Sequence, residues 1–243
     1  MKGTFIGFRD GKSIYESKYL KERMRKVIKS KLTKNIGMKS IETRRLILRK
    51  PRVSDWKDVV EGVGNLDVSK HVQNIPYPYT KKDALSFINK SIKKWDQGKA
   101  YQFFIELKKE RKVIGCIGLG SINKFQGVAE TGSWINRKYQ MKGYISEAKI
   151  AANNFAFNKL KLRRLNSSVF TDNTASSKTQ LGMGYKFEGI RKLAVRSRAT
   201  GKIKDINMYG LLKEDWKKLL PKIKKKIEDK INKMENRKWQ EKL

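Results

Sequence analysis

The middle of this chain alternates between short apolar runs of strand length and longer segments with helical spacing, and this order limits the fold most. Between Ser40 and Trp216 the expected order is strand, two helices, three strands, helix, strand, helix and two strands. Such alternation is typical of α/β domains, in which helices pack on a central sheet. The sequence therefore predicts one α/β domain over residues 40–216, built around a mixed sheet.

The expected elements have recognisable start and stop signals. Ser54 and Thr80 are expected to cap the first two helices, because their hydroxyls can accept hydrogen bonds from backbone N–H groups. Gly98 is expected to end the second helix. Strands are predicted at residues 46–49, 101–107, 113–121, 127–135, 165–171, 185–193 and 204–212, and helices at 54–62, 81–97, 143–159 and 174–182.

Both ends of the chain are basic and carry apolar residues at helical spacing. Residues 1–39 are otherwise irregular, but residues 19–32 have an amphipathic pattern, so a basic helical extension is expected there. Residues 217–243 predict a basic amphipathic helix, with Pro221 in its first turn, where the missing N–H is harmless. Its apolar stripe consists of Leu220, Ile223, Ile227, Ile231 and Met234.

The charge balance indicates an attraction to polyanions. The chain has 58 Lys and Arg residues against 23 Asp and Glu residues, a formal net charge of +35. Such a charge favours nucleic acid, ribosomes, anionic membrane surfaces or a phosphorylated cofactor. The alternative is that lysines are simply scattered over every surface. The basic ends are expected to dock on their own domain or on a second copy in a homodimer, with RNA or ribosome association as the other interpretation.

Cysteine and histidine are too scarce for a disulfide framework or a metal site. Cys116 is the sole cysteine, so no metal is expected and the cytoplasm is the expected compartment. Cys116 lies in an apolar strand pattern and is expected to pack in the core instead of acting as a nucleophile. His71 is expected to be a loop histidine, with a substrate contact as the alternative. No apolar run approaches the ~18 residues of a membrane span.

The strongest chemical signal is a strand that ends in a glycine-containing turn before a helix. Trp134 and Ile135 end the strand, and the turn runs from Gln140 to Gly143. A helix start offers several N–H groups without helical partners and the positive end of a dipole, which together can bind phosphate. An ordinary strand-to-helix turn is the competing interpretation of this segment alone.

A second motif follows the next strand. Asn173 and Ser176 come directly after that strand, and residues 184–189 read Gly-Tyr-Lys-Phe-Glu-Gly. Together with Gln140 and Gly143, this two-part pattern resembles the GCN5-related N-acetyltransferase (GNAT) superfamily, and within it the branch of ribosomal-protein N-terminal acetyltransferases. The segments 42–49 and 205–216 are also similar to this branch. Ile145 departs from the Gly or Ala that the family's pyrophosphate turn carries at that position, and Tyr185 stands in the place of a Phe.

The resemblance implies a mostly antiparallel sheet flanked by helices and acetyl-CoA as co-substrate. It implies that acetyl-CoA lies in a V-shaped gap between the strands that end near Ile135 and Thr171. The backbone at Trp134 and Ile135 would pair with the pantetheine arm, and Asn173 would bind the cofactor. The pyrophosphate would be held by the turn and the helix start, which comprise Gln140, Met141, Lys142, Gly143, Tyr144, Ile145 and Ser146.

Two side chains are candidates for the proton transfers that direct attack by an amine on a thioester requires. Glu130, on the strand before the turn, is the candidate base, acting directly or through water. Many family members protonate the leaving thiolate with a Tyr seven residues after the Asn, but Gln180 stands there in this chain. Ser176 is therefore the candidate donor. The structural alternatives are a solvent-facing carboxylate for Glu130 and a packing hydroxyl for Ser176.

The expected acceptor is a protein amine, and an N-terminal α-amino group of a ribosomal or other protein suits the resemblance best. Acetylation of a small amine or polyamine is the alternative enzymatic function, although a chain with net charge +35 would repel a polycation. A third hypothesis is an RNA- or ribosome-binding protein that keeps the fold and has lost catalysis. That hypothesis predicts tight, salt-sensitive RNA binding without turnover.

Overall fold

The computed structural model describes residues 3–9, 12–17 and 40–240, with side chains for residues 40–236. It divides the chain into two units, Met1–Met38 and Lys39–Leu243. The first unit holds an antiparallel hairpin of β1 (Gly3–Arg9) and β2 (Lys12–Ser17). The expectation of an irregular segment before residue 18 is therefore wrong. The helix expected over residues 19–32 lies outside the described residues.

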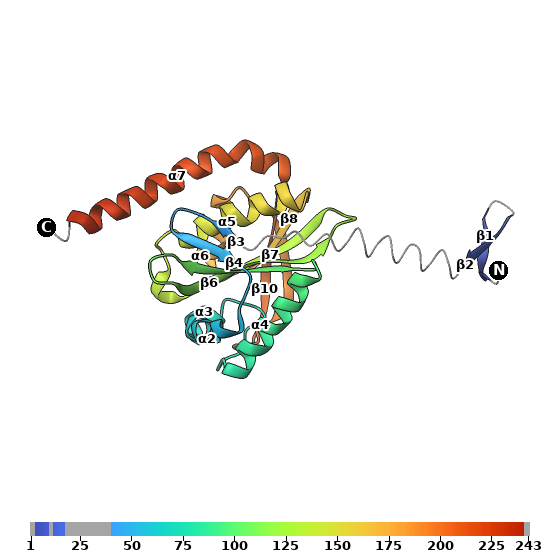
Figure 1. The fold of residues 1–243 in the computed structure, drawn as a ribbon, viewed down its shortest axis with the longest axis horizontal. Coiled ribbons are helices and arrows are strands. Elements are labelled where there is room, and N and C mark those ends of the chain that lie inside the picture. The colour runs from blue at the N-terminus through green and yellow to red at the C-terminus, as the bar shows by residue number, and fades with distance from the viewer. Residues whose placement is uncertain (1–2, 10–11, 18–39, 241–243) are drawn as a thin grey trace. The chain divides into compact units, whose positions relative to one another are not determined.

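The second unit is built on an eight-stranded sheet in the order β3-β4-β5-β6-β7-β8-β10-β9 (Figure 1). Its neighbouring strands are antiparallel, with the exception of the parallel pair β7–β8. The strands are β3 (Ser40–Glu42), β4 (Leu46–Arg49), β5 (Tyr101–Leu107), β6 (Lys112–Asn123), β7 (Val128–Ile135), β8 (Arg164–Phe170), β9 (Lys186–Arg196) and β10 (Ile203–Leu212). The mixed, mostly antiparallel sheet confirms the expected fold class.

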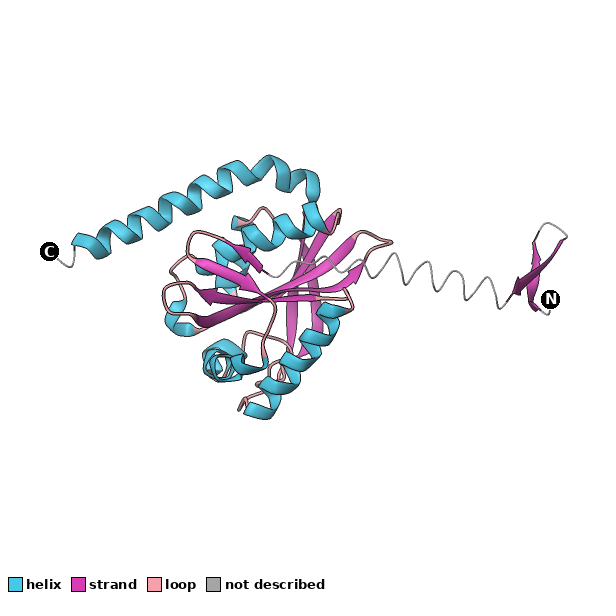
Figure 2. Ribbon diagram, viewed as in Figure 1, coloured by secondary structure: helices cyan, strands magenta, loops and turns pink. Residues whose placement is uncertain are grey.

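Helices cover both faces of this sheet (Figure 2). On one face α2 (Trp56–Val63) packs on β6 and β7, and α4 (Lys81–Asp96) packs on β5. On the other face α5 (Tyr144–Asn154) contacts β4, β6 and β7, while α6 (Thr174–Gly182) contacts β8 and β9. The short helix α3 (Leu66–Ser69) and the 3-10 turns η1 (Val53–Asp55) and η2 (Arg137–Tyr139) complete the connections.

The helix signals of the sequence are confirmed at α4 and wrong at α2. The Thr80 hydroxyl accepts the Asp83 N–H at 3.2 Å, and the Asp83 carboxylate accepts the Thr80 N–H at 2.9 Å, a capping box. Ser54 instead lies inside η1, and the N-cap of α2 is Asp55. Asp55 stabilises this start by accepting the Arg52 N–H at 2.7 Å.

Helix α5 does not run unbroken to Lys159, as the apolar spacing predicts. It changes at Phe155 into a π-helical turn, Phe155–Lys159 (η3). The Leu160 N–H reaches back five residues to the Phe155 carbonyl at 3.0 Å. The wider turn keeps Phe155, Ala156 and Phe157 buried before the chain enters β8.

The C-terminal helix α7 (Lys213–Gln240) begins before the predicted position. Pro221 therefore lies inside the helix and not in its first turn. The predicted docking of its apolar stripe on the chain's own domain is confirmed. Trp216, Ile223 and Ile231 are buried, and the Trp216 Nε1 donates to Asn154 Oδ1 of α5 at 2.9 Å. Among the described residues, no helix is long and apolar enough to span a membrane.

Candidate functional site

The neighbouring strands β7 and β8 stay paired for only part of their length. Their parallel register runs from Val128 opposite Arg164 to Thr131 opposite Ser167. Beyond that point β7 continues along β6, and β8 continues along β10. The two strands separate in the region where the family resemblance implies a gap for acetyl-CoA. On the side toward β8, the backbone of residues 132–135 pairs with no strand that the structure describes and can pair with an extended ligand.

The turn between β7 and α5 is held in a shape that glycine permits. Gln140 closes it on one side, since its Nε2 donates to the Ile135 carbonyl at 3.3 Å. Met141 and Gly143 both have positive φ, 61° and 77° respectively. Gly143 is the N-cap of α5 and accepts the Glu147 N–H at 3.1 Å. The side chains of Met141 and Lys142, in the middle of the turn, are exposed to solvent.

The first turn of α5 presents backbone donors at this point. Tyr144, Ile145 and Ser146 are half-buried, and helix geometry leaves their N–H groups without a helical carbonyl to bond. The positive end of the helix dipole adds to the attraction for an anion. The candidate phosphate residues of the sequence analysis therefore form one continuous turn.

A guanidinium group stands behind this turn. Arg45, which precedes β4, donates through Nε to Glu147 at 2.8 Å and through Nη1 to the Lys142 carbonyl at 3.0 Å. Its carbon Cζ lies 4.3 Å from the centre of the Tyr144 ring. The remaining nitrogen, Nη2, is buried, has no hydrogen-bond partner among the described residues and lies 3.5 Å from the position that a Cβ on Gly143 would take. An unpaired cationic donor at this place suits an anion bound on the turn.

Glu147 joins the first turn of α5 to the segment that precedes β4. Its carboxylate is buried and also accepts the Thr43 hydroxyl at 2.7 Å and the Arg45 N–H at 2.9 Å. These contacts join residues more than one hundred positions apart in the chain. The turn between β7 and α5 is thereby held against the segment before β4.

A buried polar cluster lies under the point where β7 and β8 separate. Lys149 of α5 donates to Gln180 Oε1 at 3.2 Å, and Gln180 Nε2 donates to Ser167 Oγ at 2.7 Å. The Tyr185 hydroxyl lies 3.3 Å from Thr131 Oγ1 and donates to Asn153 Oδ1, also at 3.3 Å. Burial lowers the pKa of Lys149 to about 8, because the charged amine is removed from water.

Glu130 lies on β7 one residue before the strands separate. Its Oε1 accepts Asn166 Nδ2 at 3.2 Å, and Asn166 Oδ1 accepts Arg164 Nε at 2.6 Å. Arg164 also pairs with Glu188. Side chains alternate along a strand, so Glu130 faces the same side of the sheet as Trp134, which packs against Gly62 of α2. Glu130 therefore lies on the face opposite α5.

Asn173 and Ser176 stand together at the start of α6. Asn173 is the N-cap, and its Oδ1 accepts the Ser176 N–H at 3.1 Å. The structure thus gives Asn173 a role in capping, which leaves its Nδ2 available to a ligand. Ser176 is half-buried, and its hydroxyl makes no hydrogen bond with the described side chains. Glu130 and Ser176 belong to different elements and are not hydrogen-bonded to each other in the part of the chain that the structure describes.

Three further residues are placed as core or loop positions. The Trp134 side chain is buried in the cluster with Val63 and Cys116, so only its backbone remains free for a ligand. Burial raises the pKa of the Cys116 thiol, which argues against a nucleophilic thiolate. His71 is half-buried after α3, and burial lowers the pKa of its imidazole. No group of acidic, cysteine and histidine side chains suited to a metal occurs among the described residues.

Arg45, Glu147 and Lys149 were not predicted from the sequence. The burial of Lys149 could have been predicted, because it lies three and four residues before Ala152 and Asn153 and therefore on the same, apolar side of α5. Arg45 and Glu147 carried no such signal, since their contact depends on tertiary structure.

Comparison with known proteins identifies the family. Residues 45–186 match the family model described as acetyltransferase (GNAT) domain. The uncharacterized N-acetyltransferase YnaD of Bacillus subtilis (strain 168) is 30% identical over 178 residues, covering 72% of this chain and 98% of its own. The ribosomal-protein-serine acetyltransferase of Escherichia coli (strain K12) is 28% identical over 131 residues, covering 54% of this chain and 71% of its own. The crystal structure of a GNAT-family acetyltransferase from Bacillus anthracis superposes with a TM-score of 0.63 at 29% identity, covering 72% and 99% of the two chains.

The residues present suit the cofactor of this family. Gly143 leaves room for close approach, and the first-turn N–H groups of α5 and the unpaired Arg45 Nη2 can bind an anion. The family model covers more than half of the 243 residues. The chain belongs to the GNAT family of N-acetyltransferases, which use acetyl-CoA as the acetyl donor.

Proposed function

We propose that this protein transfers the acetyl group of acetyl-CoA to a protein amine, and specifically to the N-terminal α-amino group of a ribosomal or other protein. The observation that carries the proposal is the position of Glu130. It stands one residue before β7 and β8 separate, on the face opposite the phosphate turn and α5. An acceptor entering from that face meets a carboxylate where the two strands part. The name of the E. coli relative, a ribosomal-protein-serine acetyltransferase, supports this acceptor class.

The proposed donor site uses the residues of the turn. The N–H groups of residues 140–146 and the Arg45 guanidinium hold the pyrophosphate, and Asn173 Nδ2 donates to the cofactor from α6. The backbone of Trp134 and Ile135 pairs with the pantetheine arm. When bound, acetyl-CoA supplies an activated thioester carbonyl.

The proposed chemistry assigns the proton transfer to one residue and the stabilisation of the leaving thiolate to another. The neutral amine attacks the carbonyl carbon, a C–N bond forms and the C–S bond breaks. Glu130 accepts the proton that the nitrogen loses, directly or through one water. The Ser176 hydroxyl donates a hydrogen bond to the departing sulfur. No acyl-enzyme forms on the buried Cys116.

The choice of an α-amino acceptor also has an energetic reason. An α-amino group has a pKa near ~7.8 and a lysine amine near ~10.4, so at neutral pH the lysine costs roughly 3.5 kcal/mol more to deprotonate. A single half-buried carboxylate is a sufficient base for an α-amino group. A lysine amine would require additional groups to remove its proton.

We expect Glu130→Gln to lower kcat/KM for an α-amino peptide by about 100-fold at pH 7, because the amine loses its proton acceptor. The loss should shrink at pH 9, where most of the amine is already neutral. Glu188→Gln is the matched control, since it removes the carboxylate at the other end of the polar chain through Arg164. Release of CoA is followed with peptides bearing a free α-amino group, with N-blocked lysine peptides and with polyamines.

Turnover confined to free α-amino peptides, lost in Glu130→Gln and kept in Glu188→Gln, supports the proposal. Turnover on blocked lysine peptides or polyamines alone would replace the proposed acceptor by another amine. Equal losses in the two variants would remove Glu130 from the mechanism. Binding of RNA without any turnover would favour a scaffold function.

A further inference from the structure

Helix α7 lies after the segment that matches the family model, and its end contacts the turn between β7 and α5. Its first half is anchored by the buried Trp216 and Ile223, and Ile231 is buried farther along. Near its end Met234 Cε lies 3.7 Å from the position that a Cβ on Gly143 would take. The segment before β4 holds the same end, because Arg44 Nη1 donates to Asn232 Oδ1 at 2.6 Å and Arg44 also pairs with Glu235.

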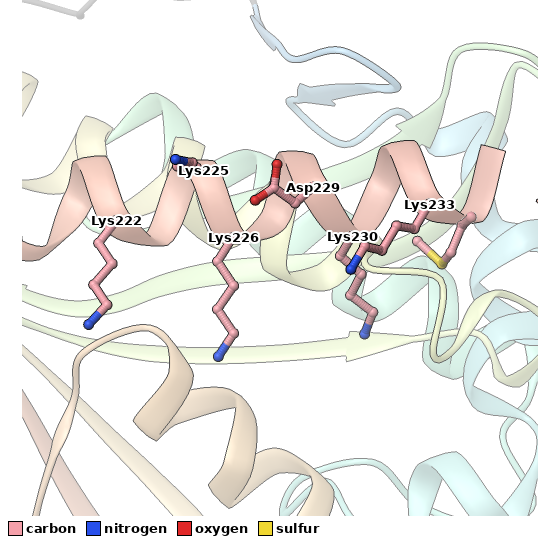
Figure 3. A pocket seen from close by; sticks show the side chains of 7 residues that line it. Lys222, Lys225, Lys226, Asp229, Lys230 and Lys233 are labelled. Carbon is pink, nitrogen blue, oxygen red and sulfur yellow. The ribbon is translucent and has the colours of Figure 1, made fainter. Parts of the chain in front are cut away.

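One side of α7 carries a row of lysines that ends at this contact. Five lysines, one aspartate and Met234 line a surface cavity of about 660 Å³. Figure 3 shows that Lys222, Lys226 and Lys230 extend to the same side of the helix, with Lys233 close to Lys230. We call Lys222, Lys225, Lys226, Lys230 and Lys233 the lysine row. At 1.5 Å per residue, Lys230 and Lys226 lie roughly 6 and 12 Å along the axis from Met234.

The lysine row carries a net positive charge that acidic side chains in the lining do not neutralise. None of its five members forms an ion pair within residues 40–236, and Asp229 is the only acidic residue in the lining. Like charges three and four positions apart destabilise a helix by a few tenths of a kcal/mol per pair. A ligand with several negative charges would offset this repulsion.

Acetyl-CoA carries such charges close to the turn. Its pyrophosphate would lie on the α5 start, and its 3′-phosphate belongs to the same nucleotide portion. We propose that the lysine row forms a second phosphate-binding element of this protein, which binds the 3′-phosphate of acetyl-CoA. This inference rests on the binding of acetyl-CoA at the turn before α5. The buried side chains of α7 hold the helix on the domain with Met234 at the turn, so the lysine row leads away from the turn along one side of the proposed cofactor site.

Lys226→Gln/Lys230→Gln removes two charges from the row, and Lys218→Gln/Lys224→Gln removes two exposed charges of α7 that do not line the cavity. Titration calorimetry with CoA and with dephospho-CoA measures the affinity of each full-length protein. We expect the row variant to bind CoA about tenfold more weakly than the unmodified protein, because two charge-assisted contacts are lost. Its affinity for dephospho-CoA should change less than twofold, and its salt dependence should be shallower. The control variant should match the unmodified protein.

Equal weakening by the two variants would overturn the proposal, because it would indicate a general charge effect. A row variant that binds CoA normally would overturn it as well, and a simultaneous loss of binding to a single-stranded RNA would assign the row to nucleic acid. If the unmodified protein bound CoA without a difference between CoA and dephospho-CoA, the 3′-phosphate contact would be wrong while the proposed function stood. No binding of acetyl-CoA to the unmodified protein would contradict both.

Discussion

Replacing Lys149 with Met should raise the free energy of unfolding at pH 7 by about 2 kcal/mol. Lys149 is buried, and its one hydrogen bond is to Gln180 Oε1. Lowering its pKa from 10.5 to about 8 corresponds to roughly 3 kcal/mol of lost stability at neutral pH. Methionine has a similar length and removes the buried charge. The lost hydrogen bond to Gln180 offsets about 1 kcal/mol of the gain.

The stability advantage of Lys149→Met should depend on pH between about 8 and 10.5. Below pH 8 the lysine is charged in both the folded and the unfolded chain, so its full burial cost is present. Between pH 8 and 10.5 the folded protein loses the proton while the unfolded chain keeps it, so the stability of the unmodified protein rises relative to the variant. The stability difference between the two proteins should therefore change by roughly 3 kcal/mol across this window, so that Lys149→Met becomes the less stable protein by about 1 kcal/mol at its upper end.

Urea unfolding of the unmodified protein and Lys149→Met at pH 7 and pH 10 measures this difference, and other titrating groups cancel between the two. Lys90→Met is the matched control, since Lys90 is an exposed lysine inside α4. Its effect should stay within about 0.5 kcal/mol at both pH values. A Lys149→Met protein that is less stable at pH 7 would show that the amine is stabilised in its charged form.

Replacing Arg49 with Met should lower the free energy of unfolding by about 3–5 kcal/mol. Arg49 is buried and donates to both oxygens of Asp55, at 2.9 and 2.8 Å, and to Glu106 at 2.6 Å. The two carboxylates are buried as well. Without the guanidinium, two negative charges would remain in the interior, and the exposed Arg111, which lies near Glu106, would be too weak a partner to replace it. Asp55 also forms the start of α2, so the loss extends from the sheet into the helix.

Arg111→Met provides the matched control for this cluster. Arg111 Nε contacts the same Glu106 carboxylate at 3.5 Å, but its side chain is 79% exposed. Exposed ion pairs contribute about 0–1 kcal/mol, so this variant should unfold almost like the unmodified protein. Chemical denaturation of both variants measures the contrast. Comparable losses in the two variants would contradict the buried character of the Arg49 cluster.

The sequence predicted the elements that carry complete local signals. Strands β4 and β5 and helix α6 begin and end where their apolar patterns do, and α4 follows its Thr80 and Gly98 signals. The hairpin of β1 and β2 was overlooked, although Asp10-Gly11 is a dipeptide favoured in two-residue hairpin turns. Strand β3 and helix α3 have three and four residues, too few to show a period.

The candidate site was predictable where it depends on one continuous segment. The turn from Gln140 to Ser146 could be located because its glycine and the following helix are adjacent in the chain. The Arg45–Glu147 contact and the return of Met234 to Gly143 join distant segments, and local pattern contains no information about such contacts. Pro221 was misplaced because α7 begins at Lys213, four residues before the predicted start at Lys217.

The most direct test of the account is the affinity for acetyl-CoA of the unmodified protein, Gly143→Val and Gly201→Val. Both glycines have positive φ, 77° and 69°, so both variants carry similar backbone strain. Gly201 lies in the turn between β9 and β10, and a Cβ there would meet no neighbouring atom. The account predicts that Gly143→Val weakens binding by about 30-fold or more, because a branched side chain occupies the cradle, and that Gly201→Val binds normally. Acetyl-CoA binding that is absent from the unmodified protein, or unchanged in Gly143→Val, would contradict it.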